Sequence, residues 1–357
     1  MSLFFYNIFL AGYTAVLQIA ALFHSKARKW VAGRRGWRKH FSRALASTAG
    51  KKRLWIHCAS LGEFEQGRPL IEAIKKQYPD YAVVLTFFSP SGYEVRKNYP
   101  GADHIFYLPA DGQINARAFI DMVAPERVIF VKYEYWYHYL HTLQTRNIPV
   151  ILISAAFRPE QVFFRWYGGF FRQLLQKFSR IFVQDEQSAR LLAGISITEG
   201  VTVAGDTRYD RVTEIAAQSR SFPLLETFRG NNRLIIAGST WPADENILHE
   251  AWHVFPHDWK LVLAPHEIDA GHTRELQRQF RDDVVLYSEL QVGTGDAGKR
   301  VLLIDNIGML SALYRYGEIA YVGGGFQKGG IHNILEPAVF GLPVVFGPNY
   351  RKFVEAR

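Results

Sequence analysis

The sequence predicts an α/β protein with two Rossmann-like, doubly wound domains facing a cleft, preceded by an N-terminal membrane-associated helix. Three observations support this. The chain has 357 residues, long for a single core. Apolar strand-length runs alternate with helix-length segments in two successive series, a pattern typical of parallel sheets covered by helices. Residues 1–23 carry no charged side chain. Hydrophobic residues make up 48% and charged residues 21% of the chain, which excludes a disordered protein.

The first 24 residues are predicted to form a membrane anchor helix, because about 20 apolar residues are enough to cross a bilayer. Tyr6, Asn7 and Gln18 interrupt the apolar run, so the helix either spans the membrane or lies in its interface. Residues 25–50 follow as a basic juxtamembrane segment without acidic residues. Basic residues after a first apolar span keep that flank in the cytoplasm and attract anionic lipid.

Two other interpretations of the N-terminus remain open: a cleaved signal peptide and a buried helix of a soluble protein. A signal peptide normally carries its positive charges before the apolar stretch, whereas here they follow it. The net charge of +9 indicates an anionic partner. Its position beside the apolar span favours a membrane surface over nucleic acid. The single cysteine, Cys58, excludes an internal disulfide and favours a reducing compartment.

The first predicted domain covers residues 51–215 and has an acceptor-binding sheet of βα units. Its expected strands are 54–59, 82–88, 127–132, 149–154 and 181–184, and its expected helices are 66–77, 115–123 and 162–178.

The second predicted domain covers residues 225–357. Its expected strands are 234–238, 259–264, 284–287, 301–304, 319–322 and 343–346, and its expected helices are 243–254, 271–280 and 308–316. The boundary is placed in the polar segment 211–232, which contains Pro223 and Gly230. Ligands of doubly wound domains bind at the carboxyl ends of the strands, so the cleft is the expected site.

Residues 323–336, GGGFQKGGIHNILE, follow the strand at 319–322 and indicate a nucleotide site. Glycines let a backbone approach a ligand closely. The helix-length run 334–340 would offer free N–H groups to a phosphate. Glu336 could accept hydrogen bonds from a ribose diol or could complement the helix dipole. Glycine-rich turns alone are a weak nucleotide signal.

Three side chains are candidates for chemistry in the first domain. Glu63 follows the strand at 54–59 and could act as a general base, although acids are common in first helical turns. Glu134 follows another strand amid aromatic residues, where packing is the ordinary explanation. Arg208, in the segment GDTRYD, could stabilise a departing phosphate or be a surface arginine.

No metal site or cofactor is predicted. The segment HEAWH at 249–253 matches a zinc pattern but has no third ligand nearby. GTGDAGKR at 293–300 has Arg300 where a P-loop needs Ser or Thr. No D-x-D segment occurs, so dipoles and basic side chains would have to meet phosphate charge.

Together the segments ASLGEF, GDTRYD, GSTWPADE, LAPHEID, DNIGMLSALY and GGGFQKGGIHNILEP resemble the 3-deoxy-D-manno-octulosonic acid (Kdo) transferases of lipopolysaccharide synthesis. The resemblance covers the whole chain. It implies a GT-B fold, with the acceptor in the first domain and CMP-Kdo in the second. It also implies inverting, metal-independent transfer without a cofactor, from CMP-Kdo to lipid IVA, the phosphorylated lipid A precursor. The implied location is the cytoplasmic face of the cell inner membrane.

The resemblance assigns roles to matching residues. Glu63 matches the catalytic base, and Glu134 and Arg208 match the groups that stabilise the transition state. The residues that match contacts to CMP are Pro265, His266, Ile307, Gly308, Met309, Asn333, Ile334, Leu335 and Glu336.

Four departures from the family pattern stand out. His266 replaces a common Arg, so the charge opposite phosphate is expected to depend on pH. Met309 replaces a common Glu, which leaves only backbone contact, and Arg208 replaces a common Lys. The chain ends soon after the last donor motif, so the second domain is expected to be truncated. Alternatives are a GT-B lipid glycosyltransferase that uses a UDP-sugar, or a non-catalytic, membrane-associated nucleotide-binding protein.

Overall fold

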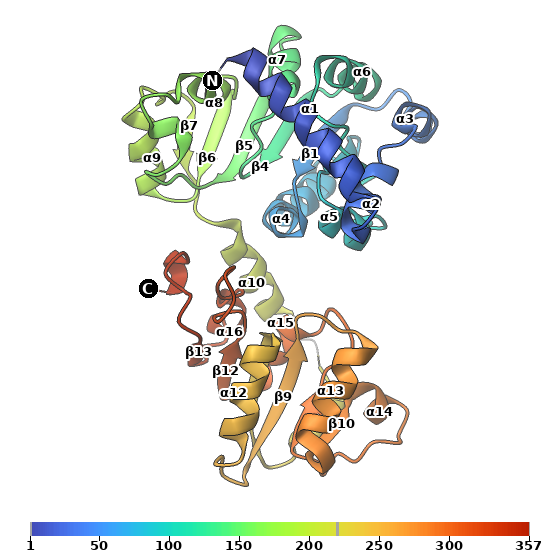
Figure 1. Ribbon diagram of the computed structural model, residues 1–357, viewed down its shortest axis with the longest axis vertical. Helices are drawn as coiled ribbons and strands as arrows, with labels where there is room; N and C mark the ends of the chain where they lie inside the picture. The colour runs from blue at the N-terminus through green and yellow to red at the C-terminus, as the bar shows by residue number, and fades with distance from the viewer. Residues whose placement is uncertain (1, 219–220, 357) are drawn as a thin grey trace. The chain divides into compact units, whose positions relative to one another are not determined.

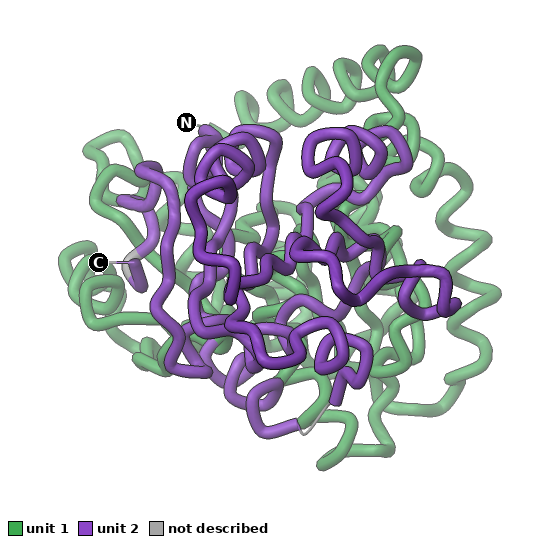
Figure 2. Tube along the Cα trace, turned by 90° about the horizontal axis from the view of Figure 1, so that it is seen from below, with its two compact units in different colours: residues 1–208 green, residues 209–357 purple. Residues whose placement is uncertain are grey.

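The computed structural model describes residues 2–218 and 221–356. It divides into two compact units, Met1–Arg208 and Tyr209–Arg357, coloured separately in Figure 2. The division falls near the start of helix α10 (Thr207–Ala217), a few residues before the predicted boundary segment. Ser219 and Arg220 of that segment, Met1 of the predicted anchor and Arg357 of the predicted second domain lie outside the described residues.

Unit 1 contains a seven-stranded, wholly parallel sheet with the order β3-β2-β1-β4-β5-β6-β7 (Figure 1). The five strands predicted in this region are confirmed to within one residue at each end. β3 and β7 are additional. The strands are β1 (Arg53–Cys58), β2 (Ala82–Phe87), β3 (His104–Tyr107), β4 (Arg127–Val131), β5 (Val150–Ala155), β6 (Arg180–Val183) and β7 (Val201–Val203).

Alternate residues of the strands enter two different cores, as expected for a doubly wound sheet. Trp55 of β1 and Phe130 of β4 belong to one cluster, whereas Ile56 and Ile129 belong to the other. The helices that cover the two faces are α1 (Leu3–Ala20), α2 (Ser25–Ala32), α3 (Trp37–Leu45), α4 (Leu61–Gln77), α5 (Pro90–Arg96), α6 (Gln113–Val123), α7 (Tyr137–Thr145), α8 (Gly169–Leu175) and α9 (Glu186–Ala193).

The single helix predicted over 162–178 is wrong. The segment forms a short 3-10 turn, η2 (Val162–Phe164), then an irregular turn, then α8. At Gly168 a Cβ atom would come within 2.0 Å of the Val162 carbonyl oxygen. The chain folds back tightly at this glycine, in a turn that separates η2 from α8.

The basic segment 25–50, which lies before the predicted bounds of the first domain, packs into unit 1. Trp37, Phe41 and Leu45 of α3 are buried in the same core as Phe106, and the rings of Phe41 and Phe106 stack at 3.9 Å. The spacing of four residues puts the apolar side chains on one helix face. Basic residues such as Lys39 remain exposed on the rest of the helix.

Unit 2 contains a six-stranded, wholly parallel sheet with the order β10-β11-β9-β8-β12-β13. The six predicted strands are confirmed to within two residues at each end. They are β8 (Arg233–Thr240), β9 (Trp259–Pro265), β10 (Val284–Leu286), β11 (Val301–Leu303), β12 (Ile319–Val322) and β13 (Val344–Phe346). The helices are α10, α11 (Pro223–Arg229), α12 (Pro242–Trp252), α13 (Ala270–Phe280), α14 (Tyr287–Gln291), α15 (Leu310–Leu313) and α16 (Leu335–Ala338).

The helix expected over 334–340 is much shorter than predicted. α16 has four residues, and the chain then leaves the helix through Gly341, which has φ +74°. Pro337 has no backbone N–H to donate, so the helical hydrogen bonds of this turn are incomplete. The dipole of so short a helix is small, and any phosphate held here would depend mainly on individual N–H groups.

The packing of α3 can be tested by replacing Phe41 with Ala. Because Phe41 is 2% exposed and packs against the rings of Phe106 and Phe119, among others, we expect the variant to lose about 3–5 kcal/mol of unfolding free energy, measured by urea denaturation. Lys39→Ala, on the exposed side of the same helix, should change it by less than about 0.5 kcal/mol. Equal stability of the two variants would show that α3 is not part of the core.

Candidate active site

The candidate residues of unit 1 lie at the carboxyl edge of its sheet. Glu63 is in the first turn of α4, which follows β1. Lys132 and Glu134 follow β4, and Arg208 follows β7 at the start of α10. Because all strands are parallel, these segments emerge at the same edge.

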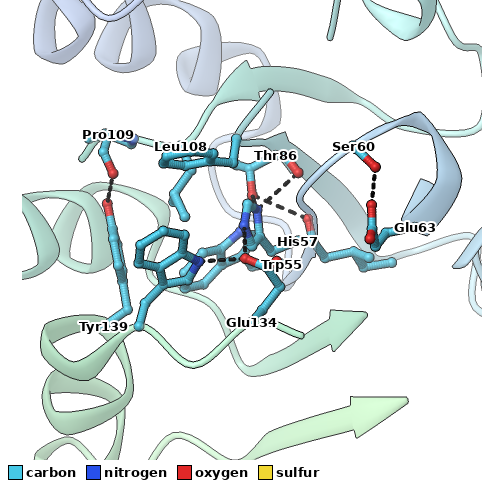
Figure 3. Close-up of polar contacts among 12 residues, drawn as sticks. Trp55, His57, Ser60, Glu63, Thr86, Leu108, Pro109, Glu134 and Tyr139 are labelled. Carbon is cyan, nitrogen blue, oxygen red and sulfur yellow. Dashed lines mark hydrogen bonds and ion pairs between the residues drawn. The ribbon is translucent and has the colours of Figure 1, made fainter. Parts of the chain in front are cut away.

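Glu63 is a half-buried carboxylate held by a neighbouring serine. Ser60, the N-cap residue of α4, donates a hydrogen bond from Oγ to Glu63 Oε2, and its side chain makes no hydrogen bond to the helix backbone (Figure 3). The serine therefore orients the carboxylate. This position on the rim is compatible with general-base chemistry.

Glu134 lies deeper, with 4% of its surface exposed. Its Oε2 atom accepts a hydrogen bond from His57 Nε2 at 2.9 Å (Figure 3). It also accepts a hydrogen bond from Trp136 Nε1. His57 is itself fully buried, and its Nδ1 atom lies 2.9 Å from Thr86 Oγ1. With Glu134 ionised, the carboxylate can only accept, so the proton on Nε2 points toward it. The side chains of His57 and Trp136 therefore hold the Glu134 carboxylate in place through hydrogen bonds.

The structure adds Lys132, which sequence reasoning missed, to this edge. Lys132 has φ +70°, a conformation that a non-glycine residue rarely adopts and that is frequent at functional sites. Burial lowers the pKa of Lys132, the charge of Arg208 lowers it further, and Glu63 and Asp206 raise it. Lys132 thus shares one electrostatic neighbourhood with both candidate residues. Its sequence signal was a lysine directly after a buried strand.

Arg208 is positioned by the segment that contains it. Asp206 Oδ2 accepts from Arg208 Nε at 2.8 Å and from Nη2 at 2.5 Å. Thr207 Oγ1 donates to the carbonyl oxygen of Gln66 at 2.7 Å and lies 3.1 Å from Ser154 Oγ. These bonds tie the GDTR segment to α4, the helix that carries Glu63, and to the end of β5.

In unit 2, a buried carboxylate organises the glycine-rich segment. Asp244 has no exposed surface and accepts hydrogen bonds from Tyr321 Oη at 2.7 Å and from the backbone N atoms of Gly324 and Trp241, each at 3.0 Å. At Gly323 a Cβ atom would come within 2.2 Å of the Ser239 carbonyl oxygen. This glycine is needed for packing between protein loops, and not only for approach to a ligand as the sequence indicated.

Three rings stack beside this loop: those of Trp241, His266 and His332. The Trp241 and His266 centroids are 4.8 Å apart, and those of His266 and His332 are 4.3 Å apart. Trp241 Nε1 donates to His332 Nε2 at 3.0 Å, so neutral His332 carries its proton on Nδ1. Burial lowers the pKa of His332 to about 4 and also lowers the pKa of His266. Both imidazoles are therefore uncharged at neutral pH.

Trp241 and His332 were not among the predicted contacts. Trp241 follows β8 and His332 follows β12, and these two strands are hydrogen-bonded neighbours in the sheet. Only that pairing brings the two residues together.

The other predicted nucleotide contacts lie at the carboxyl edge of the same sheet, after β9, β11 and β12. Asn333 Nδ2 donates to Glu336 Oε1 at 3.2 Å, and Asn333 Oδ1 accepts from the backbone N of Leu335 at 3.2 Å. Ile307, by contrast, is 89% exposed. The side chains of three predicted contacts are buried and leave only their backbone for a ligand: Met309, Ile334 and Leu335. Pro265 ends β9, and Gly308 has φ +99°.

Among the residues that the structure describes, no group of three or more His, Cys, Asp or Glu side chains is arranged to hold a metal ion. The rings of His249 on α12 and of His253, the C-cap residue of that helix, are 4.9 Å apart, without such a group around them.

The profile of the family described as 3-deoxy-D-manno-octulosonic-acid transferase (kdotransferase) matches residues 35–211. A 3-deoxy-D-manno-octulosonic acid transferase of Haemophilus influenzae is 26% identical over 87% of this chain and 74% of its own length. That of Aquifex aeolicus is 28% identical over 85% of this chain and 78% of its own length.

Solved structures support the fold. The UDP-GlcNAc 2-epimerase of Methanocaldococcus jannaschii superposes with a TM-score of 0.55 at 14% identity, over 85% of this chain and 86% of that one. At this identity the similarity concerns the fold alone, two Rossmann-like units of the GT-B type. The matched family segment contains Glu63, Glu134 and Arg208, and the matched relatives cover most of both units. The chain belongs to the Kdo transferases, the glycosyltransferases that transfer Kdo in lipopolysaccharide synthesis.

Proposed function

We propose that this enzyme transfers Kdo from CMP-Kdo to lipid IVA with inversion and without a catalytic metal, at the cytoplasmic face of the inner membrane. The observation that carries the proposal is the Glu63 carboxylate on the rim of the unit 1 sheet, in one electrostatic neighbourhood with Lys132 and Arg208. The family assignment supports Kdo transfer itself. The donor, the acceptor and the stereochemistry are part of the proposal.

In the proposed reaction, Glu63 removes the proton of a sugar hydroxyl on the acceptor. The hydroxyl oxygen attacks the anomeric carbon of Kdo from the side opposite the phosphate. The bond from that carbon to the phosphate oxygen breaks, and CMP leaves with the electron pair. The attack from the opposite side inverts the configuration.

The ordinary role of an acid in a first helical turn is to complement the helix dipole. The contacts of Glu63 support a role in the reaction in addition to this one. Ser60 could cap the helix but donates to the Glu63 carboxylate instead. Lys132 and Arg208 supply positive charge in the same region. Both cations would stabilise the anions that the reaction brings there, namely the phosphate of the donor and the carboxylate of Kdo.

Arg208 would offset charge on the departing phosphate, because Asp206 already fixes the direction of its guanidinium group. Glu134 would act indirectly. His57 and Trp136 donate to its Oε2 atom, so this oxygen would support the loop after β4 and would not bind substrate.

Unit 2 would hold the nucleotide. The backbone at 308–309 and 334–335 would face CMP, and Glu336, oriented by Asn333, would accept from the ribose diol. The stacked rings of Trp241, His266 and His332 would form a rigid wall beside it.

We expect Glu63→Gln to lower the rate of transfer from CMP-Kdo to lipid IVA by about 10²–10⁴-fold, because the amide cannot accept the proton. CMP affinity should remain unchanged. The matched control is Glu186→Gln, which changes an exposed acid in the first turn of α9 after β6 and should be fully active. Near-normal turnover by Glu63→Gln would remove Glu63 from the role of base.

Ligand-induced thermal stabilisation distinguishes the proposed donor from a UDP-sugar. CMP should raise the melting temperature and UDP should not. Glu336→Ala should weaken CMP binding by about 10–100-fold, because it removes a charged acceptor of the ribose diol. Asp282→Ala, which changes an exposed acid of the same unit, should bind CMP normally. Stronger stabilisation by UDP would favour a UDP-sugar transferase, and CMP binding without transfer would favour a non-catalytic protein.

CMP affinity should also depend on pH through His266. Burial lowers the pKa of His266, so the ring is neutral at pH 7 and gains a positive charge only at more acidic pH. Isothermal titration between about pH 5 and pH 8 should show wild-type affinity rising relative to His266→Gln as the pH falls. This comparison cancels the titration of CMP itself. His266→Arg should bind more tightly without that dependence. Parallel pH profiles for wild type and His266→Gln would show that His266 does not face the phosphate.

A further inference from the structure

Helix α1 is bound to unit 1 by polar contacts near its N-terminal end. The Tyr6 hydroxyl donates to Asp111 Oδ2 at 2.7 Å and accepts from the backbone N of Tyr137 at 3.2 Å. Asn7 Oδ1 lies 2.7 Å from His138 Nε2. Asp111 and His138 are both buried. Two of the three polar residues that interrupt the apolar run, Tyr6 and Asn7, therefore contact the domain, whereas Gln18 is exposed.

The same helix is also held at its middle and at its C-terminal end. The Tyr13 ring lies 6.3 Å from that of Phe88 and 6.4 Å from that of Trp30. Arg28 donates to the carbonyl oxygens of Ala21 and Leu22 just beyond the helix. In Figure 1, α1 runs along the face of unit 1 for its whole length.

These attachments conflict with a helix that crosses the bilayer. Tyr6 lies 15 residues before Ala21, about 22 Å along the helix axis. If Ala21 were at the membrane surface and the helix crossed, Asp111 would have to enter the hydrocarbon core together with Tyr6. An acidic side chain and irregular backbone of a soluble domain are very costly at that depth.

The outer face of α1 is a continuous apolar surface. Phe4, Phe5, Phe9, Val16 and Ile19 are each at least 60% exposed. Among the described residues, helix α1 is the one long and apolar enough to span a membrane, but only 6% of its apolar window is buried in the protein. So large an exposed apolar surface needs a partner.

A second exposed aromatic group lies in a turn close to α1. Trp166 is 91% exposed and Tyr167 is 53% exposed, in the turn before α8. Phe170 of α8 contacts Tyr6 of α1, with ring centroids 5.7 Å apart, so this turn is close to the N-terminal half of α1. Trp and Tyr are the side chains that concentrate at the level of lipid headgroups.

The charge next to the apolar face identifies the partner. The cations of α2 and α3 and the turn between them are exposed, except Arg34, which donates to the carbonyl oxygens of Leu108 and Phe88. Each exposed cation near an anionic membrane contributes about 1 kcal/mol of binding. The exposed cations are Lys26, Arg28, Lys29, Arg35, Arg38, Lys39 and Arg43.

We propose that α1 lies in the plane of an anionic bilayer surface, flat against unit 1, and does not cross the membrane. Trp166 and Tyr167 insert beside it as a second anchor, and the exposed cations of α2 and α3 contact the headgroups. This proposal rests on the membrane location given under the proposed function and specifies how the protein is attached there. It does not depend on the transfer reaction.

Topology can be tested with a thiol introduced at the start of the chain. The variant Ser2→Cys in the full-length protein is treated in intact cells and in inverted membrane vesicles with a membrane-impermeant maleimide. A helix in the plane never exposes position 2 to the periplasm, so no labelling is expected in intact cells. Labelling from the periplasmic side would overturn the proposal. The buried Cys58 is not expected to react, and Glu186→Cys reports the cytoplasmic side.

The aromatic anchor has a separate test. Trp166→Ser should reduce partition into vesicles of phosphatidylethanolamine and phosphatidylglycerol by about tenfold or more, because a large apolar side chain is no longer buried. Val254→Ser, which changes an 82% exposed apolar residue of unit 2, should bind as wild type does.

Equal partition of both variants would overturn the insertion of Trp166.

Lys39→Glu with Arg43→Glu should weaken binding to these vesicles but not to phosphatidylcholine alone. Transfer to detergent-solubilised acceptor by Trp166→Ser should be unchanged. If the wild type does not transfer Kdo to this acceptor, the proposed reaction is contradicted. The vesicle-binding experiments still test the membrane proposal in that case, because they do not depend on transfer.

Discussion

Parallel hydrogen bonding between strands requires every strand of a sheet to end at the same edge, and the candidate active site depends on that constraint. Glu63, Lys132 and Arg208 are far apart in the sequence, but each follows a strand of the unit 1 sheet. The nucleotide contacts proposed for unit 2 follow its strands in the same way. Helices on both faces leave this edge as the place where loops can hold a ligand.

Buried polar groups hold the loops at these edges in place. In unit 1, His57 and Trp136 satisfy one oxygen of Glu134 and fix the segment after β4. In unit 2, Asp244 binds the backbone at both Trp241 and Gly324 and joins the loops after β8 and β12. A buried carboxylate that accepts several hydrogen bonds is costly to leave unpaired, so each network favours one loop conformation.

Much of the fold could be predicted from the sequence, because long apolar runs mark buried parallel strands. β3 and β7 were missed because they are short, and β7 is largely exposed. The four-residue spacing of Trp37, Phe41 and Leu45 indicates an apolar helix face that could pack in the core. The basic residues around them led instead to the prediction of a juxtamembrane segment. Position relative to strand ends indicated Glu63, whereas the depth of Glu134 and the stack of Trp241 on His332 depend on strand pairing that one sequence does not reveal.

The central claim is that a unit 1 carboxylate acts as base toward an acceptor hydroxyl. A crystal structure of the enzyme with CMP and lipid IVA tests it most directly, through the distance from the Glu63 carboxylate to the attacking sugar oxygen. The account predicts hydrogen-bond reach, about 2.6–3.2 Å directly or through one water, with CMP on the loops after β9, β11 and β12. A Glu63 side chain turned away from the acceptor, with another base beside the hydroxyl, would contradict it.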